Sequence, residues 1–390
     1  MYDFDKIVER LNTYSEKWNC DKDTLPMWVA DMDFDIAPAI KDAIYKRLDQ
    51  GALGYSYVSD DLFNSYINFW KRHHNTLIKK EWLIFSTGVV ASISSVVRSI
   101  TNVGDNVLIM SPVYNIFYNS IINNKRVVVS SDLVYENGAY HIDFCDLEEK
   151  LKNPKTTLLI LCNPHNPIGK IWTKDELEKI GHLAKINNVT ILSDEIHCDI
   201  VRQNHSCTSF LSLNEECKNN SITTIAPSKC FNIAGLNSSM IVVPNETLYK
   251  KVSRGLNTDE CAEPNAFANI ATIAAFNECD DWLQELNHYL DENIKIFNDF
   301  IKKELPILSV VKADATYLLW VNCASITDDT TKMCAFIKEK TGLWITSGAV
   351  YGENGKSFFR INIASPRKYL FDGMDRLKKG ISMYINEKNS

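Results

Sequence analysis

The sequence reads Ala226-Pro227-Ser228-Lys229-Cys230-Phe231-Asn232 directly after the apolar run Ile222-Thr223-Thr224-Ile225. The apolar run is typical of a buried strand, so Lys229 stands just beyond a strand end, beside a hydroxyl group and clear of any charge run. A lysine in this position is better suited to an open cleft above a sheet than to a solvated surface. We interpret Lys229 as a covalent anchor for a cofactor.

A strand followed by a turn and a helix recurs along the chain. Strands are predicted at residues 82–85, 106–110, 157–161, 189–193 and 222–225. Before the fourth of them, Thr173 and Glu176 form a capping box for a helix that runs through Ile186. The alternation predicts an α/β fold whose mostly parallel sheet is covered by helices on both faces, because the strand runs are apolar throughout.

Five residues each follow the end of a different predicted strand: Gly88, Tyr114, Asn166, Asp194 and Lys229. Ligands of parallel sheets bind beyond the carboxyl ends of the strands, so we expect these residues to meet at one edge. Gly88 also precedes a predicted helix, whose free N–H groups and dipole suit a phosphate. Taken singly, Asp194 is equally well explained as a helix cap, Asn166 as a turn residue and Tyr114 as a core residue.

The chain divides into three predicted parts. Residues 1–45 form an N-terminal arm with a helix that begins at Pro38, residues 46–280 form a large domain, and residues 281–390 form a smaller α+β domain that the arm joins. The elements predicted in the small domain are a helix at 282–303, strands at 316–321, near Trp344 and at 358–364, and a final helix. The aromatic cluster at 26–34 is open to three interpretations: packing on its own core, a dimer contact, or a wall of the active site.

The composition narrows the class of protein. The 390 residues are 45% hydrophobic and carry a formal net charge of −7 without a long basic run, which argues against nucleic acid or an anionic membrane as a partner and favours a small substrate. Eleven cysteines occur without a CxxC pair, so neither a disulfide framework nor a metal site is expected. With no signal-peptide pattern and no apolar run of membrane-spanning length, the expected location is the cytoplasm.

The residues at the five strand ends match the needs of pyridoxal phosphate. This cofactor requires a lysine for its aldehyde carbon, a carboxylate for its pyridine nitrogen, an aromatic ring that stacks on it and a seat for its phosphate. Packing alone explains these residues poorly when they occur together and in this order. We therefore predict a pyridoxal-phosphate enzyme.

Longer motifs extend from about residue 20 to residue 367. They are PMWVADMDF, CNPHNPIGKIW, LSDEIHCDI, APSKCFNIAGL and FFRINIASPR. With these motifs the chain resembles the fold-type-I pyridoxal-phosphate enzymes of the aminotransferase class I/II superfamily. More narrowly, it is similar to the MalY/PatB branch of cystathionine β-lyases.

The resemblance implies a role for each matching residue. Lys229 matches the catalytic lysine that binds the cofactor, Asp194 the partner of the pyridine nitrogen, and Tyr114 the stacking ring. Arg360 matches the arginine that binds the substrate α-carboxylate, because a planar guanidinium group fits a carboxylate. The remaining cofactor contacts are Asn166 and His197 near the phenolic oxygen, Gly88, Val89 and Ser228 at the phosphate, and Tyr55, which reaches the phosphate of the neighbouring subunit in a homodimer.

Three positions depart from patterns common in the superfamily. Cys230 stands where the branch more often has threonine. His197 occupies a place where aminotransferases of this fold usually have tyrosine, which favours the lyase branch. Asn237 stands where many aminotransferases carry a phosphate-binding arginine, so hydroxyl groups and backbone amides are expected to hold the phosphate.

The resemblance implies a carbon–sulfur β-lyase that cleaves cystathionine or a related cysteine S-conjugate to a thiol, pyruvate and ammonia. An aminotransferase on the same scaffold stays open, because only His197 and the branch-like motifs separate the two reactions in the sequence. A regulatory binding protein and a cofactor-free relative are further alternatives, although the retained Lys229 and Asp194 argue that chemistry persists.

Overall fold

The computed structural model describes residues 2–389, and its largest feature is a seven-stranded sheet in the order β2-β10-β9-β8-β7-β3-β4. All its strands run parallel except β10, which pairs antiparallel with both neighbours. This sheet confirms the predicted α/β fold. The strands are β2 (Leu83–Ser86), β3 (Asn106–Ile109), β4 (Val127–Ser130), β7 (Thr156–Cys162), β8 (Thr190–Asp194), β9 (Ser221–Ile225) and β10 (Ser239–Val242).

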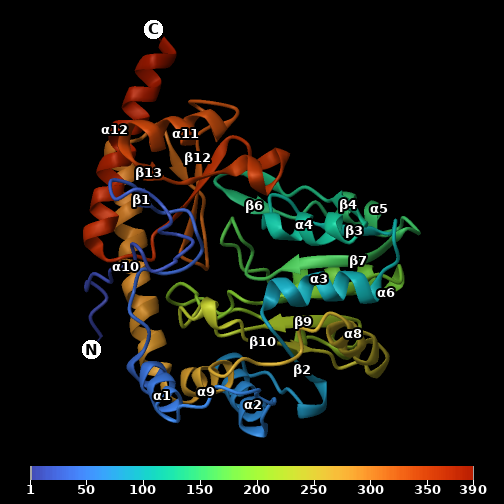
Figure 1. The fold of residues 1–390 in the computed structure, drawn as a ribbon. Helices are drawn as coiled ribbons and strands as arrows, with labels where there is room; N and C mark the ends of the chain where they lie inside the picture. Colours follow the sequence, from blue (N-terminus) through green and yellow to red (C-terminus); the bar gives the residue numbers. More distant parts are fainter. Residues whose placement is uncertain (1, 390) are drawn as a thin grey trace.

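Helices cover both faces of this sheet because its central strands are apolar on both sides (Figure 1). In β7, Leu158 and Ile160 pack in one core with α3, α4 and α8, whereas Leu159 and Leu161 pack in another with α5 and α6. The bounds are α3 (Val89–Ile100), α4 (Asn115–Asn123), α5 (Phe144–Leu151), α6 (Lys174–Ile186), α7 (Glu215–Asn219) and α8 (Glu246–Thr258). The predicted capping box of Thr173 and Glu176 is present at the start of α6.

A second, antiparallel sheet has the order β11-β12-β15-β14. Its strands are β11 (Ser309–Val310), β12 (Leu318–Asn322), β14 (Thr346–Ser347) and β15 (Phe358–Asn362). The helices in the same part of the chain are α10 (Asp280–Glu304), α11 (Thr330–Thr341) and α12 (Arg367–Asn389). The strand predicted from residue 316 begins only at Leu318, because Thr316 has φ +67°, outside the strand region. A separate hairpin joins β5 (Val134–Glu136) and β6 (Ala139–His141).

The N-terminal arm runs along the second sheet rather than the first. Its strand β1 (Leu25–Pro26) pairs in parallel with β13 (Leu343–Trp344), and the Asn362 side-chain amide donates to the carbonyls of Val29 and Asp31, at 2.6 Å each. The arm then enters α1 (Pro38–Asp49), which begins at Pro38 as predicted and packs with α2 (Asp60–His74) against α9 (Ala268–Glu278). Figure 1 shows the arm, in blue, beside α10 and α12.

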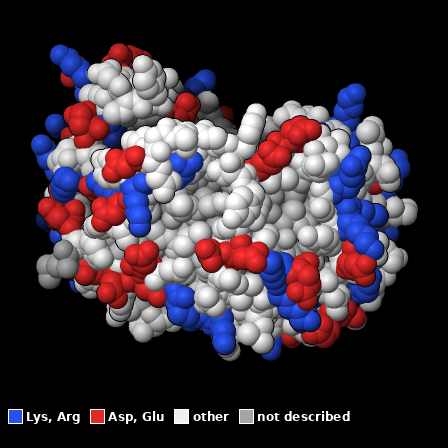
Figure 2. Space-filling model, turned by 60° about the horizontal axis from the view of Figure 1, so that its bottom comes forward, with Lys and Arg blue, Asp and Glu red and all other residues white. Residues whose placement is uncertain are grey.

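The surface carries mixed charge. Figure 2 shows acidic and basic side chains interspersed around a wide uncharged area on the face that it draws. Among residues 2–389, every helix is either too short or too polar for a membrane span.

Buried ion pairs hold the arm in place. The carboxylate of Asp33 accepts hydrogen bonds of 2.7 Å from Lys17 Nζ, from Arg10 Nη1 and from the Trp18 indole N–H. Arg10 also donates through both Nη atoms to Asp31, at 3.2 and 2.6 Å. Since Lys17 and Asp33 are almost completely buried, each charge depends on the other for solvation.

We expect Asp33→Ala to lower the free energy of unfolding by about 3–5 kcal/mol, because it leaves the ammonium group of Lys17 buried without its carboxylate. Urea unfolding measures the loss. Asp35→Ala is the matched control, because Asp35 is partly exposed and pairs with the exposed Lys6 and Lys41, so its loss is about 0–1 kcal/mol. Equal losses in the two variants would contradict the role of the buried pair.

Candidate active site

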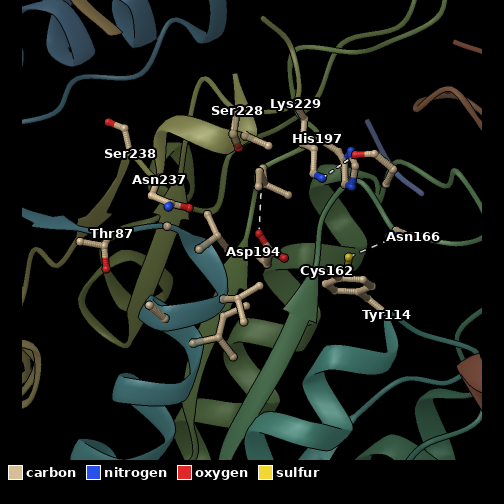
Figure 3. A pocket seen from close by; sticks show the side chains of 18 residues that line it. Thr87, Tyr114, Cys162, Asn166, Asp194, His197, Ser228, Lys229, Asn237 and Ser238 are labelled. Atoms are coloured by element: carbon tan, nitrogen blue, oxygen red, sulfur yellow. Dashed lines mark hydrogen bonds between the residues drawn. The ribbon is translucent and has the colours of Figure 1, made fainter. Parts of the chain in front are cut away.

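A cavity of about 180 Å³ lies at the carboxyl ends of the central strands. Figure 3 shows Asp194 near its centre, Thr87, Asn237 and Ser238 on one side, and Asn166, Cys162 and Tyr114 on the other. Its walls bring together most of the cofactor residues predicted from the sequence: Gly88, Val89, Tyr114, Asn166, Asp194, His197, Ser228 and Lys229. The five strand-end residues therefore meet at one edge, as predicted.

Lys229 reaches the cavity from the turn that follows β9. Its Nζ donates a hydrogen bond of 2.6 Å to the carbonyl oxygen of Ala30, which belongs to the N-terminal arm. Burial lowers the pKa of Lys229 to about 8; the Asp31 and Asp194 carboxylates oppose this effect, whereas the Arg360 charge adds to it. An amine with this pKa exists partly in its nucleophilic, neutral form near neutral pH.

Asp194 is the last residue of β8 and lies between β7 and β9, opposite Cys162 and Thr224 in the strand register. Its Oδ1 accepts from the Thr224 hydroxyl at 3.2 Å and from the Ile196 N–H at 3.3 Å. Burial raises its pKa to about 6, although both hydrogen bonds and the charge of Lys229 act in the other direction. A carboxylate held in this way gains free energy from a cationic N–H partner in the cavity.

The opposite end of the cavity is the N-terminus of α3. Gly88 precedes the helix with φ +115°, a backbone conformation that residues with a Cβ rarely adopt. No side chain of residues 2–389 caps the helix there. The side chains of Thr87, Ser228, Asn237 and Ser238 line this end. Unpaired N–H groups at a helix N-terminus and neutral hydroxyl and amide groups suit a phosphate, which is the ligand that the sequence led us to expect here.

His197 and Asn166 lie on the side of the cavity nearer to Lys229. Among residues 2–389, the buried Nδ1 of His197 has no hydrogen-bond partner, and burial lowers the pKa of this imidazole to about 3. Tyr114 lines the same side, and burial raises its pKa to about 12, so its phenol stays neutral. An amine, a buried carboxyl, an unpaired imidazole nitrogen and a phosphate seat fit pyridoxal phosphate.

Arg360 and Tyr55 lie outside the lining of this cavity. Arg360 is buried in β15; its Nη1 donates to Asn166 Oδ1 at 3.1 Å and its Nη2 to the Trp28 carbonyl at 2.8 Å. Its buried Nε has no hydrogen-bond partner among residues 2–389. The Tyr55 side chain is fully exposed between α1 and α2.

Sequence analysis missed several residues of the cavity, among them Ala30, Cys162 and Ser238. Ser238 precedes β10, an antiparallel strand that was not predicted because no α-helix separates it from β9, so it falls outside the strand–turn–helix repeat. Cys162 is the last residue of β7, one position beyond the end of the strand predicted at 157–161. Ala30 takes part through its backbone carbonyl, for which the amino-acid type gives no signal.

Comparisons with known proteins agree with this geometry. The family model described as aminotransferase class I and II matches residues 22–377. The chain belongs to this family. It is 38% identical to cystathionine beta-lyase PatB of Bacillus subtilis over 97% of the chain and 100% of the relative.

Two solved structures of relatives share the fold over nearly the whole chain. The PLP-bound putative aminotransferase from Clostridium difficile 630 is 40% identical with a TM-score of 0.95, over 98% of this chain and 100% of that one. The PLP-bound C-S lyase from Staphylococcus hominis is 34% identical with a TM-score of 0.90, over 97% and 98%. The family and its pyridoxal-phosphate fold, both expected from the motifs, are thus confirmed.

Glu195 follows Asp194 in the chain and is completely buried. It accepts hydrogen bonds from Ser193, Ser209 and the Phe210 N–H. Burial raises its pKa from 4.5 to about 7, although these hydrogen bonds favour the carboxylate. The folded chain therefore binds a proton at Glu195 more tightly than the unfolded chain does.

The stability that this protonation supplies is fully present below about pH 4.5 and is lost as the pH rises through about 7. The Glu195→Gln side chain cannot ionise. We therefore expect its free energy of unfolding, relative to that of the wild type, to rise by up to about 3 kcal/mol between pH 5 and pH 8. Urea unfolding of both proteins at the two pH values measures this change. Asp194 is present in both, so its own titration cancels, and a stability difference independent of pH would refute the prediction.

Proposed function

We propose that this chain is a pyridoxal-phosphate-dependent carbon–sulfur β-lyase. The reaction cleaves cystathionine or a related cysteine S-conjugate with water to a thiol, pyruvate and ammonia. The observation that carries the proposal is the cavity in which Lys229 and Asp194 face the uncapped N-terminus of α3. Identity of 38% with a relative named cystathionine beta-lyase supports the choice of reaction.

The chain's own groups supply the contacts that the cofactor needs. When bound, pyridoxal phosphate provides a protonated pyridine ring that accepts the electron pair released at the substrate α-carbon. Asp194 would hold the pyridine N–H, Tyr114 would stack on the ring, and Asn166 and His197 would lie near its phenolic oxygen. Gly88, Val89 and Ser228 would hold the phosphate, and Lys229 would bind the cofactor covalently.

Lys229 also carries the proton transfer in this proposal. With substrate and cofactor bound, Nζ would remove the α-proton of the substrate. The lowered pKa of about 8 supports this role, because a base works best when its pKa lies near the working pH. The protonated Nζ can then donate this proton later in the reaction.

Arg360 would bind the substrate carboxylate. Its guanidinium is buried and its Nε faces no acceptor among residues 2–389, so a carboxylate would satisfy a donor that the protein leaves unpaired. Asn166, the partner of its Nη1, also lines the cofactor cavity. The proposed carboxylate site therefore adjoins the proposed cofactor site.

The division of the chain into an arm at 1–45, a large domain at 46–280 and a small domain at 281–390 stays part of the proposal. The large domain would supply the cofactor contacts, whereas the small domain would supply Arg360. We also propose a cytoplasmic homodimer in which Tyr55 reaches the phosphate of the partner subunit. The exposed apolar side chains of Leu53, Tyr55 and Tyr57 support an interface at this segment.

An aminotransferase is the second candidate, because a solved relative of 40% identity is described as a putative aminotransferase. The two reactions differ in whether the α-carbon electrons expel the β-substituent or are quenched by a proton on the cofactor. A regulatory binding protein on the same fold is a third candidate. Unlike the first two, it does not require turnover.

The reactions are separated by supplying cystathionine to the purified, cofactor-loaded protein without a keto acid. We expect pyruvate and thiol over many turnovers, and we expect Lys229→Ala to lose both turnover and the visible absorption of the lysine-bound cofactor. Lys250→Ala, at an exposed lysine, is the control that keeps both. A stall at the amine form of the cofactor would favour the aminotransferase, and multiple turnovers by Lys229→Ala would defeat the assignment.

Arg360→Ala is expected to lower kcat/KM for cystathionine by roughly 30- to 4,000-fold, which corresponds to about 2–5 kcal/mol for a lost buried charge pair. The loss should fall mainly on KM, because the carboxylate is bound before and during the reaction. Arg360→Lys keeps the positive charge but lacks the planar guanidinium group, so it should recover part of the loss in kcat/KM. Unchanged KM values in both variants would remove Arg360 from the substrate site.

A further inference from the structure

A second group of reactive side chains lies outside the cofactor cavity. His74 is the last residue of α2, and Cys198 and Asp199 follow β8 directly after His197. One donor atom from each of the three lies within 4.8 Å of the other two. His74 Nε2 lies 2.7 Å from Asp199 Oδ1 and 3.7 Å from Cys198 Sγ, and Cys198 Sγ lies 3.7 Å from Asp199 Oδ2.

These separations are close to those in a tetrahedral metal site. Bonds of about 2.0–2.2 Å to nitrogen and oxygen and about 2.3 Å to sulfur place neighbouring ligand atoms about 3.3–3.7 Å apart. The two distances to sulfur already match. The imidazole contact of 2.7 Å is made to the other carboxylate oxygen, Oδ1, so the carboxylate has to turn, and the contact has to widen by about 0.6 Å, before one oxygen of Asp199 binds the ion beside His74 and Cys198. This change exchanges a hydrogen bond for two metal bonds.

The chemistry of the three donors selects a class of ion. Imidazole nitrogen, thiolate sulfur and carboxylate oxygen together suit zinc-like divalent ions rather than Mg²⁺ or Ca²⁺, which prefer oxygen ligands. A thiolate and a carboxylate would also neutralise the two charges of the ion. Because Cys198 and Asp199 are buried, that neutralisation matters more than it would at the surface.

The triad is accessible from outside. All three residues line a second hollow, of about 570 Å³, which is separate from the cofactor cavity. The same hollow is lined by further imidazoles and carboxylates that would attract a cation on its way in: His73, His205, His288, Asp280 and Asp291. It also leaves room for water as a fourth ligand.

We propose that His74, Cys198 and Asp199 form a binding site for one zinc-like divalent metal ion per chain. The bound ion ties the end of α2 to the segment that carries His197. The site uses none of the residues that line the cofactor cavity, so its test does not depend on the lyase assignment.

The test uses cofactor-loaded protein freed of metal with a chelator and titrated with CoCl₂, then with ZnCl₂. We expect one Co²⁺ per chain, a sulfur-to-cobalt absorption band, displacement by Zn²⁺ and a higher Tm in either metal. Cys198→Ala should lose the sulfur band, and His74→Gln should weaken Co²⁺ binding at least tenfold. Cys145→Ala, at an exposed thiol, and Cys207→Ala, at a buried thiol of the same hollow, should keep the band.

A wild-type protein that binds no Co²⁺ at a saturable site would overturn the proposal. So would a sulfur band that survives in Cys198→Ala or disappears in Cys207→Ala. Circular dichroism and cofactor absorption show whether each variant is folded. Should Cys198→Ala fail to fold, anomalous diffraction at the zinc edge from wild-type crystals soaked in ZnCl₂ decides, because a peak away from the three side chains refutes the site.

Discussion

Asp194 is held at the end of β8 between two parallel neighbours, and the chemistry of the cavity depends on that pairing. The register aligns Cys162, Asp194 and Thr224 across β7, β8 and β9, so the carboxyl group lies at the centre of the sheet edge rather than at its rim. Two hydrogen bonds are too few to compensate for its burial, and its pKa rises accordingly. A cavity built around such a group favours a ligand that brings a protonated nitrogen.

The sequence predicted the parts of this arrangement that follow from periodicity. The apolar runs of the sequence predicted the parallel strands. Because ligands bind at the carboxyl ends of such strands, the residues that follow them were predicted to lie together: Gly88, Tyr114, Asn166, Asp194 and Lys229. The antiparallel β10 was not predicted, because it follows β9 without an intervening α-helix and so breaks the repeat that indicated the other strands. The delayed start of β12 depends on the positive φ of Thr316, a tertiary constraint without a sequence signal.

Side-chain contacts between distant segments leave no sequence signal where no strand pattern groups the residues. His74 and Asp199 are 125 positions apart, so no local spacing of cysteines and histidines indicates that their side chains meet. The expectation of no metal site rested on local spacing alone. Only the packing of α2 against the segment after β8 brings an imidazole, a thiol and a carboxylate to one point.

The N-terminal arm links the stability of the fold to the geometry of the site. Backbone carbonyls of the arm accept hydrogen bonds from the two cationic side chains of the site, Ala30 from Lys229 and Trp28 from Arg360. Residues 28–31 have no regular secondary structure, so their position depends on the side-chain amide of Asn362 and on the buried carboxylate of Asp33. Weakening the ion pairs of Asp31 and Asp33 would therefore loosen the backbone carbonyls that orient Lys229 and Arg360. This loosening would precede unfolding of the sheet, because neither aspartate belongs to a strand.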